Sequence, residues 1–120
     1  MPDRELAAAL QRPVPEVKAE LFKALAHPAR IRVLEVLAEG EQSVGELLPL
    51  VGIEASHLSQ QLGVLRRAGL VRTRRAGSTV VYAIAVPDTV ELLAVAKRVL
   101  IGSLAQTEDL LADLRAAARE

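Results

Sequence analysis

The chain has no cysteine and no tryptophan, and its only large aromatic side chains are Phe22 and Tyr82. The lack of cysteine excludes disulfides, thiolate metal sites and cysteine nucleophiles. No apolar run reaches the roughly 18 residues that a membrane span needs, and the N-terminus lacks the basic and apolar segments of a signal peptide. We therefore expect a cytoplasmic protein with no membrane partner and a core of Leu, Val, Ile and Ala.

Acidic residues are also missing from one long segment, between Ala55 and Pro87. The whole chain balances 15 basic against 15 acidic side chains, whereas this segment holds five arginines and no acid. Its charge of +5 leaves −5 for the rest of the chain. Contacts to phosphate are local, because salt screens charges over roughly 8 Å. A neutral chain with such a patch is therefore compatible with nucleic-acid binding.

The 120 residues, 51% of them hydrophobic, suffice for one domain with a buried core. Apolar spacing and helix-ending residues predict helices over residues 3–11, 15–26, 29–38, 47–51 and 54–68, with a long helical region from residue 87 onward. Ser43 and Glu46 form a predicted capping box before the short fourth helix. We expect the last helix to break or soften near Gly102 and Ser103.

Two features after the capping box predict the fold. The fourth and fifth helices flank a short turn that contains Gly52, which matches a helix-turn-helix. The segment "LVRTRRAGSTVVYAI" reads as two strands around the turn Ala76-Gly77-Ser78. The expected fold class is mainly α with a β-hairpin wing, that is, a winged helix-turn-helix.

The fifth helix has two chemically distinct faces on a helical wheel. Leu58, Leu62 and Leu65 form the core stripe, and the opposite face carries short neutral polar groups and then arginine. Ser and Gln can hydrogen-bond base edges, whereas a carboxylate would be repelled by phosphate. The alternative is a solvated polar face without a partner. The DNA-contacting residues predicted on this helix are Ser56, His57, Ser59, Gln60, Gln61 and Arg67, with Gly63 providing close approach.

The hairpin would add positive charge beside that helix. Its predicted DNA-contacting residues are Arg72, Arg74, Arg75, Ser78 and Thr79. The alternative is an edge hairpin protected by charge alone. An enzyme is not favoured, because Ser56 and His57 are neighbours on a helix and do not face each other.

The motifs "LAHPARIRVL" and "LSQQLGVLRRAGLV" resemble the ArsR/SmtB family of winged-helix bacterial repressors, over roughly Lys18 to Val86. The resemblance implies a homodimer built from the first and last helices. It also implies operator binding by the second helix of the motif and by the wing. The expected organisation is a single domain over 1–120, with a DNA-binding unit at about 15–86 and dimerisation helices at 1–14 and 87–120.

The pattern of the last helix also predicts dimerisation. Apolar residues between Val90 and Leu104 surround the helix rather than forming one stripe, so it needs partners on two sides. The alternative is a helix wrapped by its own chain. A two-fold dimer would read a palindromic DNA site. The predicted interface residues are Leu21, Leu92, Val95, Val99, Leu100 and Leu104.

The effector cannot be assigned from the family pattern. The resemblance implies metal sites made of a Cys pair on the short helix or of Asp and His on the last helix, and neither set is present. His27, before a proline, reads as a structural, capping residue. A carboxylate site of Glu108, Asp109 and Asp113 across a dimer, completed by a histidine, would bind a divalent metal weakly.

The prediction for function is an effector-responsive, sequence-specific DNA-binding regulator, a repressor that acts as a homodimer on an operator. Two alternatives stay open. One is a nickel- or zinc-type metal-responsive regulator with a non-cysteine site, and the other is a winged-helix protein-interaction module that does not read DNA. No metal or other cofactor is assigned, and the effector is unknown.

Overall fold

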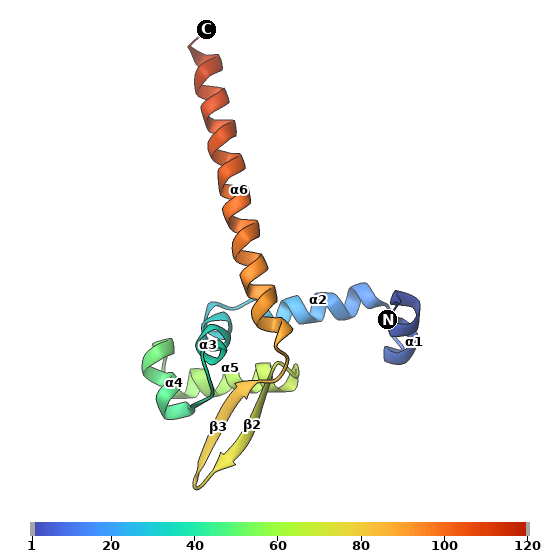
Figure 1. Cartoon of the computed structure of the whole chain (residues 1–120), viewed down its shortest axis with the longest axis vertical. Helices are drawn as coiled ribbons and strands as arrows, with labels where there is room; N and C mark the ends of the chain where they lie inside the picture. Colours follow the sequence, from blue (N-terminus) through green and yellow to red (C-terminus); the bar gives the residue numbers. More distant parts are fainter. Residues whose placement is uncertain (1, 120) are drawn as a thin grey trace. The chain divides into compact units, whose positions relative to one another are not determined.

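The computed structural model describes residues 2–119, which fall into two units that meet between Pro87 and Asp88. The first unit contains five helices and three strands, and Figure 1 labels its helices and its two longer strands. The helices are α1 (Asp3–Leu10), α2 (Val14–Leu25), α3 (Pro28–Ala38), α4 (Val44–Val51) and α5 (Ala55–Arg67). The strands are β1 (Gln42–Ser43), β2 (Val71–Ala76) and β3 (Thr79–Ile84). The predicted helices and hairpin are confirmed.

The core of the first unit is aliphatic, as the composition predicts. Its most deeply buried side chains come from α3, α4 and α5, and each is less than 2% exposed: Val33, Leu34, Leu47, Leu58, Leu62 and Leu65. Burying a leucine side chain contributes roughly 1.5–3 kcal/mol. The helix-turn-helix pair α4–α5 is thus held against α3 by branched aliphatic packing.

Side-chain caps fix where α3 and α4 begin. The Nδ1 atom of His27 accepts a hydrogen bond of 3.0 Å from the Ala29 N–H, which confirms a capping role for His27. At α4, Ser43 Oγ accepts from the Glu46 N–H at 3.2 Å, and the Ser43 N–H donates to the Glu46 carboxylate at 2.9 Å. The predicted capping box is therefore present. The hydrogen bonds from Ser43 lower the pKa of the Glu46 carboxyl.

Glycines end both helices of the motif. Gly52 closes α4 at φ 77° and donates its N–H to the Leu48 carbonyl at 2.9 Å. Gly69 follows α5 at φ 75°, and the Leu70 N–H then bonds the Leu65 carbonyl at 3.0 Å. Because these φ values are left-handed and favour glycine, the sequence sets both the turn into α5 and the turn into the wing.

The sheet has the antiparallel order β1-β3-β2. Ala76 pairs with Thr79 across the turn, and the tip of the hairpin extends beyond α3 and α5 (Figure 1). Strand β1, which the sequence pattern did not predict, pairs Gln42 with Tyr82 and Ser43 with Val81. It is only two residues long and is defined by its partner strand rather than by a pattern of its own.

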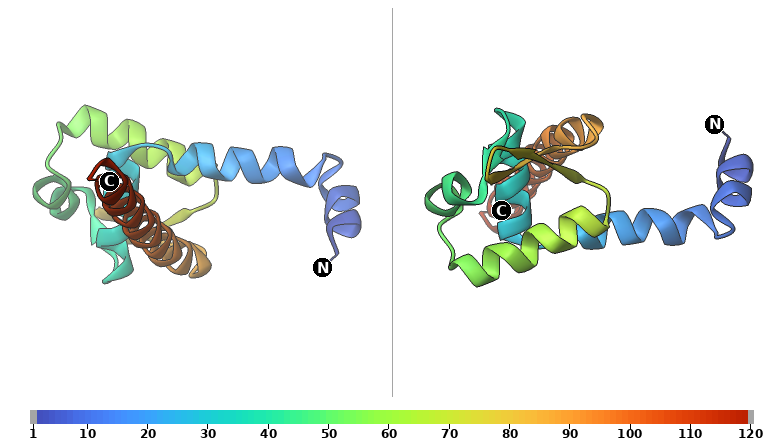
Figure 2. Two further views of the ribbon diagram at one scale, coloured as in Figure 1. Left: turned by 90° about the horizontal axis from the view of Figure 1, so that it is seen from above. Right: turned by 90° about the horizontal axis from the view of Figure 1, so that it is seen from below.

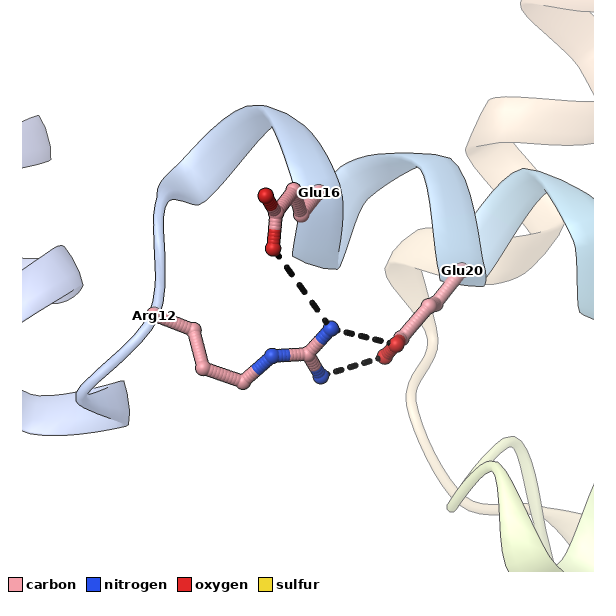
Figure 3. A network of polar contacts seen from close by, with 3 residues as sticks. All are labelled: Arg12, Glu16 and Glu20. Carbon is pink, nitrogen blue, oxygen red and sulfur yellow. Dashed lines mark hydrogen bonds and ion pairs between the residues drawn. The ribbon is translucent and has the colours of Figure 1, made fainter.

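The start of α2 is held by an ion-pair network around Arg12 (Figure 3). Its guanidinium donates to the Glu20 carboxylate at 2.8 and 2.5 Å, and its Nη2 lies 4.0 Å from the Glu16 carboxylate. Helix α1, which has no buried residue, lies at the far end of α2 from α3, α4 and α5 (Figures 1 and 2).

The second unit is one helix, α6 (Asp88–Ala118), of 31 residues. The predicted break at Gly102 and Ser103 is wrong, because the helix continues through both residues. One glycine lowers helix stability by only about 1 kcal/mol, and the Ala- and Leu-rich flanks outweigh it. The Thr107 hydroxyl donates to the Ser103 carbonyl at 3.0 Å. Within residues 2–119, no helix is both long and apolar enough to cross a membrane.

Candidate nucleic-acid interface

Helix α5 shows the two faces that its sequence predicts. Leu58, Leu62 and Leu65 are buried in the core. On the other side Ser56, Ser59, Gln60 and Arg67 are exposed. The helix carries no acidic residue and ends in two arginines. It therefore presents hydroxyl, amide and guanidinium groups to solvent without a carboxylate among them.

Gln61 is a correction to the predicted set. The sequence predicts that Gln61 contacts DNA, but its side chain is 8% exposed, and its Oε1 atom has no hydrogen-bond partner among residues 2–119. The reason is its angle on the helix, since Gln61 lies three residues after Leu58 and four before Leu65, both in the core stripe. A helical wheel places Gln61 on the core side of α5 and its neighbour Gln60 on the exposed side.

His57 lies at the edge of the exposed face. Its side chain is half-buried, and its ring packs edge-on against His27 with the ring centroids 5.5 Å apart. Because His27 caps α3, this contact joins the first turn of α5 to the first turn of α3. The ring of His57, which is predicted to contact DNA, therefore also packs within the protein.

Gly63 makes room for Arg67. A Cβ atom at Gly63 would lie 3.1 Å from Arg67 Nη1 and 3.7 Å from Arg67 Cζ. The guanidinium therefore lies back along the helix over the glycine, one turn before its own Cα. The sequence predicted that Gly63 allows close approach, and the group that approaches it in the free protein is this side chain.

Substituting Gly63 with alanine should separate stability from DNA binding. Alanine is a better helix former by roughly 0.5–1 kcal/mol, so we expect a higher free energy of unfolding in urea. The added methyl group displaces the Arg67 guanidinium, so we expect weaker DNA binding by fluorescence anisotropy. Val64→Ala, which removes half-buried apolar surface one position away, serves as a control that lowers stability. Unchanged DNA affinity in Gly63→Ala would contradict this role for Gly63.

The wing alternates as expected for a strand with one covered face. Val71 is buried and Thr73 half-buried, whereas Arg72 and Arg74 are exposed. The other predicted wing residues, Arg75, Ser78 and Thr79, are all exposed. Strand β2 also contacts α5, so the arginine wing and the polar helix belong to one packed unit.

Arg74 has a partner that sequence reasoning missed. It donates from Nε to Glu41 Oε2 at 2.9 Å and from Nη2 to Glu41 Oε1. These hydrogen bonds raise the pKa of the Arg74 guanidinium and lower that of the Glu41 carboxyl. Glu41 immediately precedes β1, and the order β1-β3-β2 brings it across β3 to Arg74. Because β1 is not predicted from the sequence pattern, this contact is not predicted either.

The residues considered for a metal site lie on α6 and at the start of α3. Glu108, Asp109 and Asp113 are exposed on α6, and His27 is committed to its cap. In the described range 2–119, no group of three or more His, Cys, Asp or Glu side chains is placed to hold a metal ion.

A helix-turn-helix with an exposed acid-free second helix, followed directly by an arginine-bearing hairpin, defines the class of winged helix-turn-helix DNA-binding proteins. The comparisons place the chain within that class. Residues 27–73 match the model of the bacterial regulatory protein, arsR family. An uncharacterized HTH-type transcriptional regulator of Mycobacterium tuberculosis, Rv0081, is 60% identical over 105 residues, which are 87% of this chain and 92% of the relative.

Solved structures agree with this assignment. The crystal structure of Rv0081 matches with a TM-score of 0.73 over 79% of this chain and 96% of that one. The homodimeric winged helix-turn-helix domain of Mb0332 from Mycobacterium bovis matches at 0.68, with 34% identity over 87% and 91% of the two chains. The transcriptional repressor BigR of Xylella fastidiosa matches at 0.65, with 38% identity over 81% and 92%. The chain belongs to the ArsR family, and it is a DNA-binding transcriptional regulator.

Proposed function

We propose that this regulator is a homodimeric repressor that binds a palindromic operator through α5 and the wing of each subunit. The observation that carries the proposal is the exposed face of α5, where Ser56, Gln60 and Arg67 lie without any acid. Gln60 suits the adenine edge in the major groove. Arg67, with Arg72 and Arg75 of the wing, suits phosphate.

Dimerisation is supported by apolar surface that a single chain leaves uncovered. On α6, Val99, Leu100 and Leu104 are 64%, 69% and 60% exposed. Exposed apolar patches of this kind mark interaction surfaces, and Mb0332 is described as a homodimer. Of the other predicted interface residues, Val95 is 38% exposed and Leu21 and Leu92 are half-buried. Phe22, next to Leu21, is 57% exposed and joins the proposed set.

Repression is supported by the likeness to BigR, a transcriptional repressor. A protein bound across a promoter excludes the polymerase, and the release signal would be an effector of the dimer. The sequence offers no thiol for redox sensing. A non-cysteine metal site between subunits would provide such a release signal if metal binding changes the affinity for DNA.

Binding and footprinting on the DNA upstream of its own gene test the proposal. We expect protection of two half-sites about one helical turn apart, and an affinity at least about 1,000-fold above that for random DNA at physiological salt. Transcription in vitro from this promoter should fall on protein addition. Parallel titrations with zinc, nickel and a chelator test metal response. Equal affinity for the upstream and random DNA would overturn the proposal and favour a protein-interaction module.

A further inference from the structure

The ion pair between Glu41 and Arg74 sets one wing arginine apart from the others. Within residues 2–119, Arg67, Arg72 and Arg75 form no ion pair, whereas Arg74 forms two hydrogen bonds to one carboxylate. Glu41 is therefore an acid that the sheet brings beside an arginine of the wing. Both side chains line one surface groove, with Arg72, Thr73, Val81 and Ala83.

The chemistry of the pair matches that of a phosphate contact. The Nε and Nη2 donors of Arg74 are occupied by two carboxylate oxygens, and the same planar pair of donors binds two oxygens of a phosphate. A DNA phosphate and the Glu41 carboxylate therefore compete for one guanidinium. A glutamate carboxyl is ionised at neutral pH, and the hydrogen bonds from Arg74 lower the pKa of Glu41 further.

The pair is poorly suited to a purely stabilising role. The side chains of Arg74 and Glu41 are 56% and 42% exposed, and exposed ion pairs contribute little to stability because water and salt screen them. For the same reason the pair is easily exchanged for another partner. The hairpin register itself is set by backbone pairing on both sides of β3, which does not depend on Glu41.

We propose that Glu41 is an affinity-limiting residue that competes with DNA phosphate for Arg74 in the wing. This inference rests on the proposed DNA-binding role of the wing. Because a phosphate contact carries no base information, Glu41 lowers affinity for operator and random DNA alike. It shortens residence on random DNA without altering which sequence is preferred. Arg74 consequently contributes less to DNA binding than Arg72 and Arg75.

Substituting Glu41 with glutamine tests the competition directly. We expect Glu41→Gln to tighten binding to operator and random DNA by about two- to five-fold for each bound subunit, the range that breaking one exposed ion pair allows. The slope of log affinity against log salt should steepen by about 0.9 for each bound subunit. Glu39→Gln removes the same charge from an exposed side chain that has no ion pair within the described residues, and it should change both quantities less.

A second measurement compares the loss of DNA affinity caused by Arg74→Gln in the natural protein and in the Glu41→Gln protein. Under competition, Arg74→Gln weakens binding more in the Glu41→Gln protein than in the natural one. If Glu41 instead holds Arg74 in position for phosphate, Glu41→Gln weakens binding and the order of the two costs reverses. That result overturns the inference while leaving the DNA-binding role intact. Equal losses of affinity from Arg74→Gln in both proteins, with no gain of affinity from Glu41→Gln, overturn it in the same way. Absence of operator binding by the natural protein overturns both.

Discussion

Replacing Leu100 and Leu104 together with glutamate is expected to convert the protein to monomers and to abolish tight operator binding. The two side chains are one turn apart on α6 and are 69% and 60% exposed in the single chain. Charging them therefore leaves the fold of the subunit intact while placing carboxylates in the proposed dimer interface. Burying such unpaired charges strongly disfavours association.

The loss of affinity follows from the loss of the second half-site. A linked pair of binding modules exceeds either module by about 100-fold or more, so we expect a fall of at least that size in operator affinity. Sedimentation velocity measures the mass, and fluorescence anisotropy measures the affinity. Gln106→Glu adds a charge at an exposed polar position on the same helix and should stay dimeric. A double variant that remains a dimer would show that α6 is not the interface.

Gln60→Ala and Arg67→Ala should weaken DNA binding in two different ways. Loss of a bidentate base contact costs roughly 1–3 kcal/mol and relaxes specificity at one base pair per half-site. Loss of a phosphate contact weakens binding on all sequences and flattens the salt dependence by about 0.9 per subunit. Competition binding against single-base operator variants, repeated at several salt concentrations, separates the two signatures.

Two nearby substitutions provide the controls for that pair. Gln61→Ala removes an amide from the same helix, but from its buried side, so it should change stability rather than base preference. Arg66→Ala removes a charge from an exposed neighbour of Arg67. Gln60 would not read a base if Gln60→Ala reduced binding to operator and to random DNA by the same factor.

The sequence predicted the framework of the fold because local signals agree there. Proline, glycine and the Ser43–Glu46 cap mark the ends of helices, and leucine spacing marks their inner faces. The exposed face of α5 followed from the same spacing. The features that the sequence did not predict depend on non-local contacts. Strand β1 exists only through pairing with β3, and the contact of Glu41 with Arg74 depends on β1.

Two further differences came from weighing a local signal wrongly. Gly102 predicts a break or softening of the last helix, but α6 continues through it because one glycine among strong helix formers does not outweigh the propensity of the surrounding turns. Residue type alone predicts the same role for Gln61 as for Gln60, although the helical angle of Gln61 places it beside Leu58 and Leu65. Residue chemistry indicated the kind of site, and only geometry decided which of two adjacent glutamines belongs to it.

In the proposed complex, the Ser56 face of α5 lies in a DNA groove twice per symmetric dimer. The natural absence of cysteine allows a single label, so Ser56→Cys can carry a tethered iron chelate that cleaves nearby DNA. We predict two clusters of operator cleavage centred about 34–36 Å apart and related by a two-fold axis. The same label at exposed Ala9 of α1 should not reproduce this pattern. No cleavage from Ser56→Cys while it stays bound to the operator, or a single cluster, would rule out this placement of α5 in a two-fold complex.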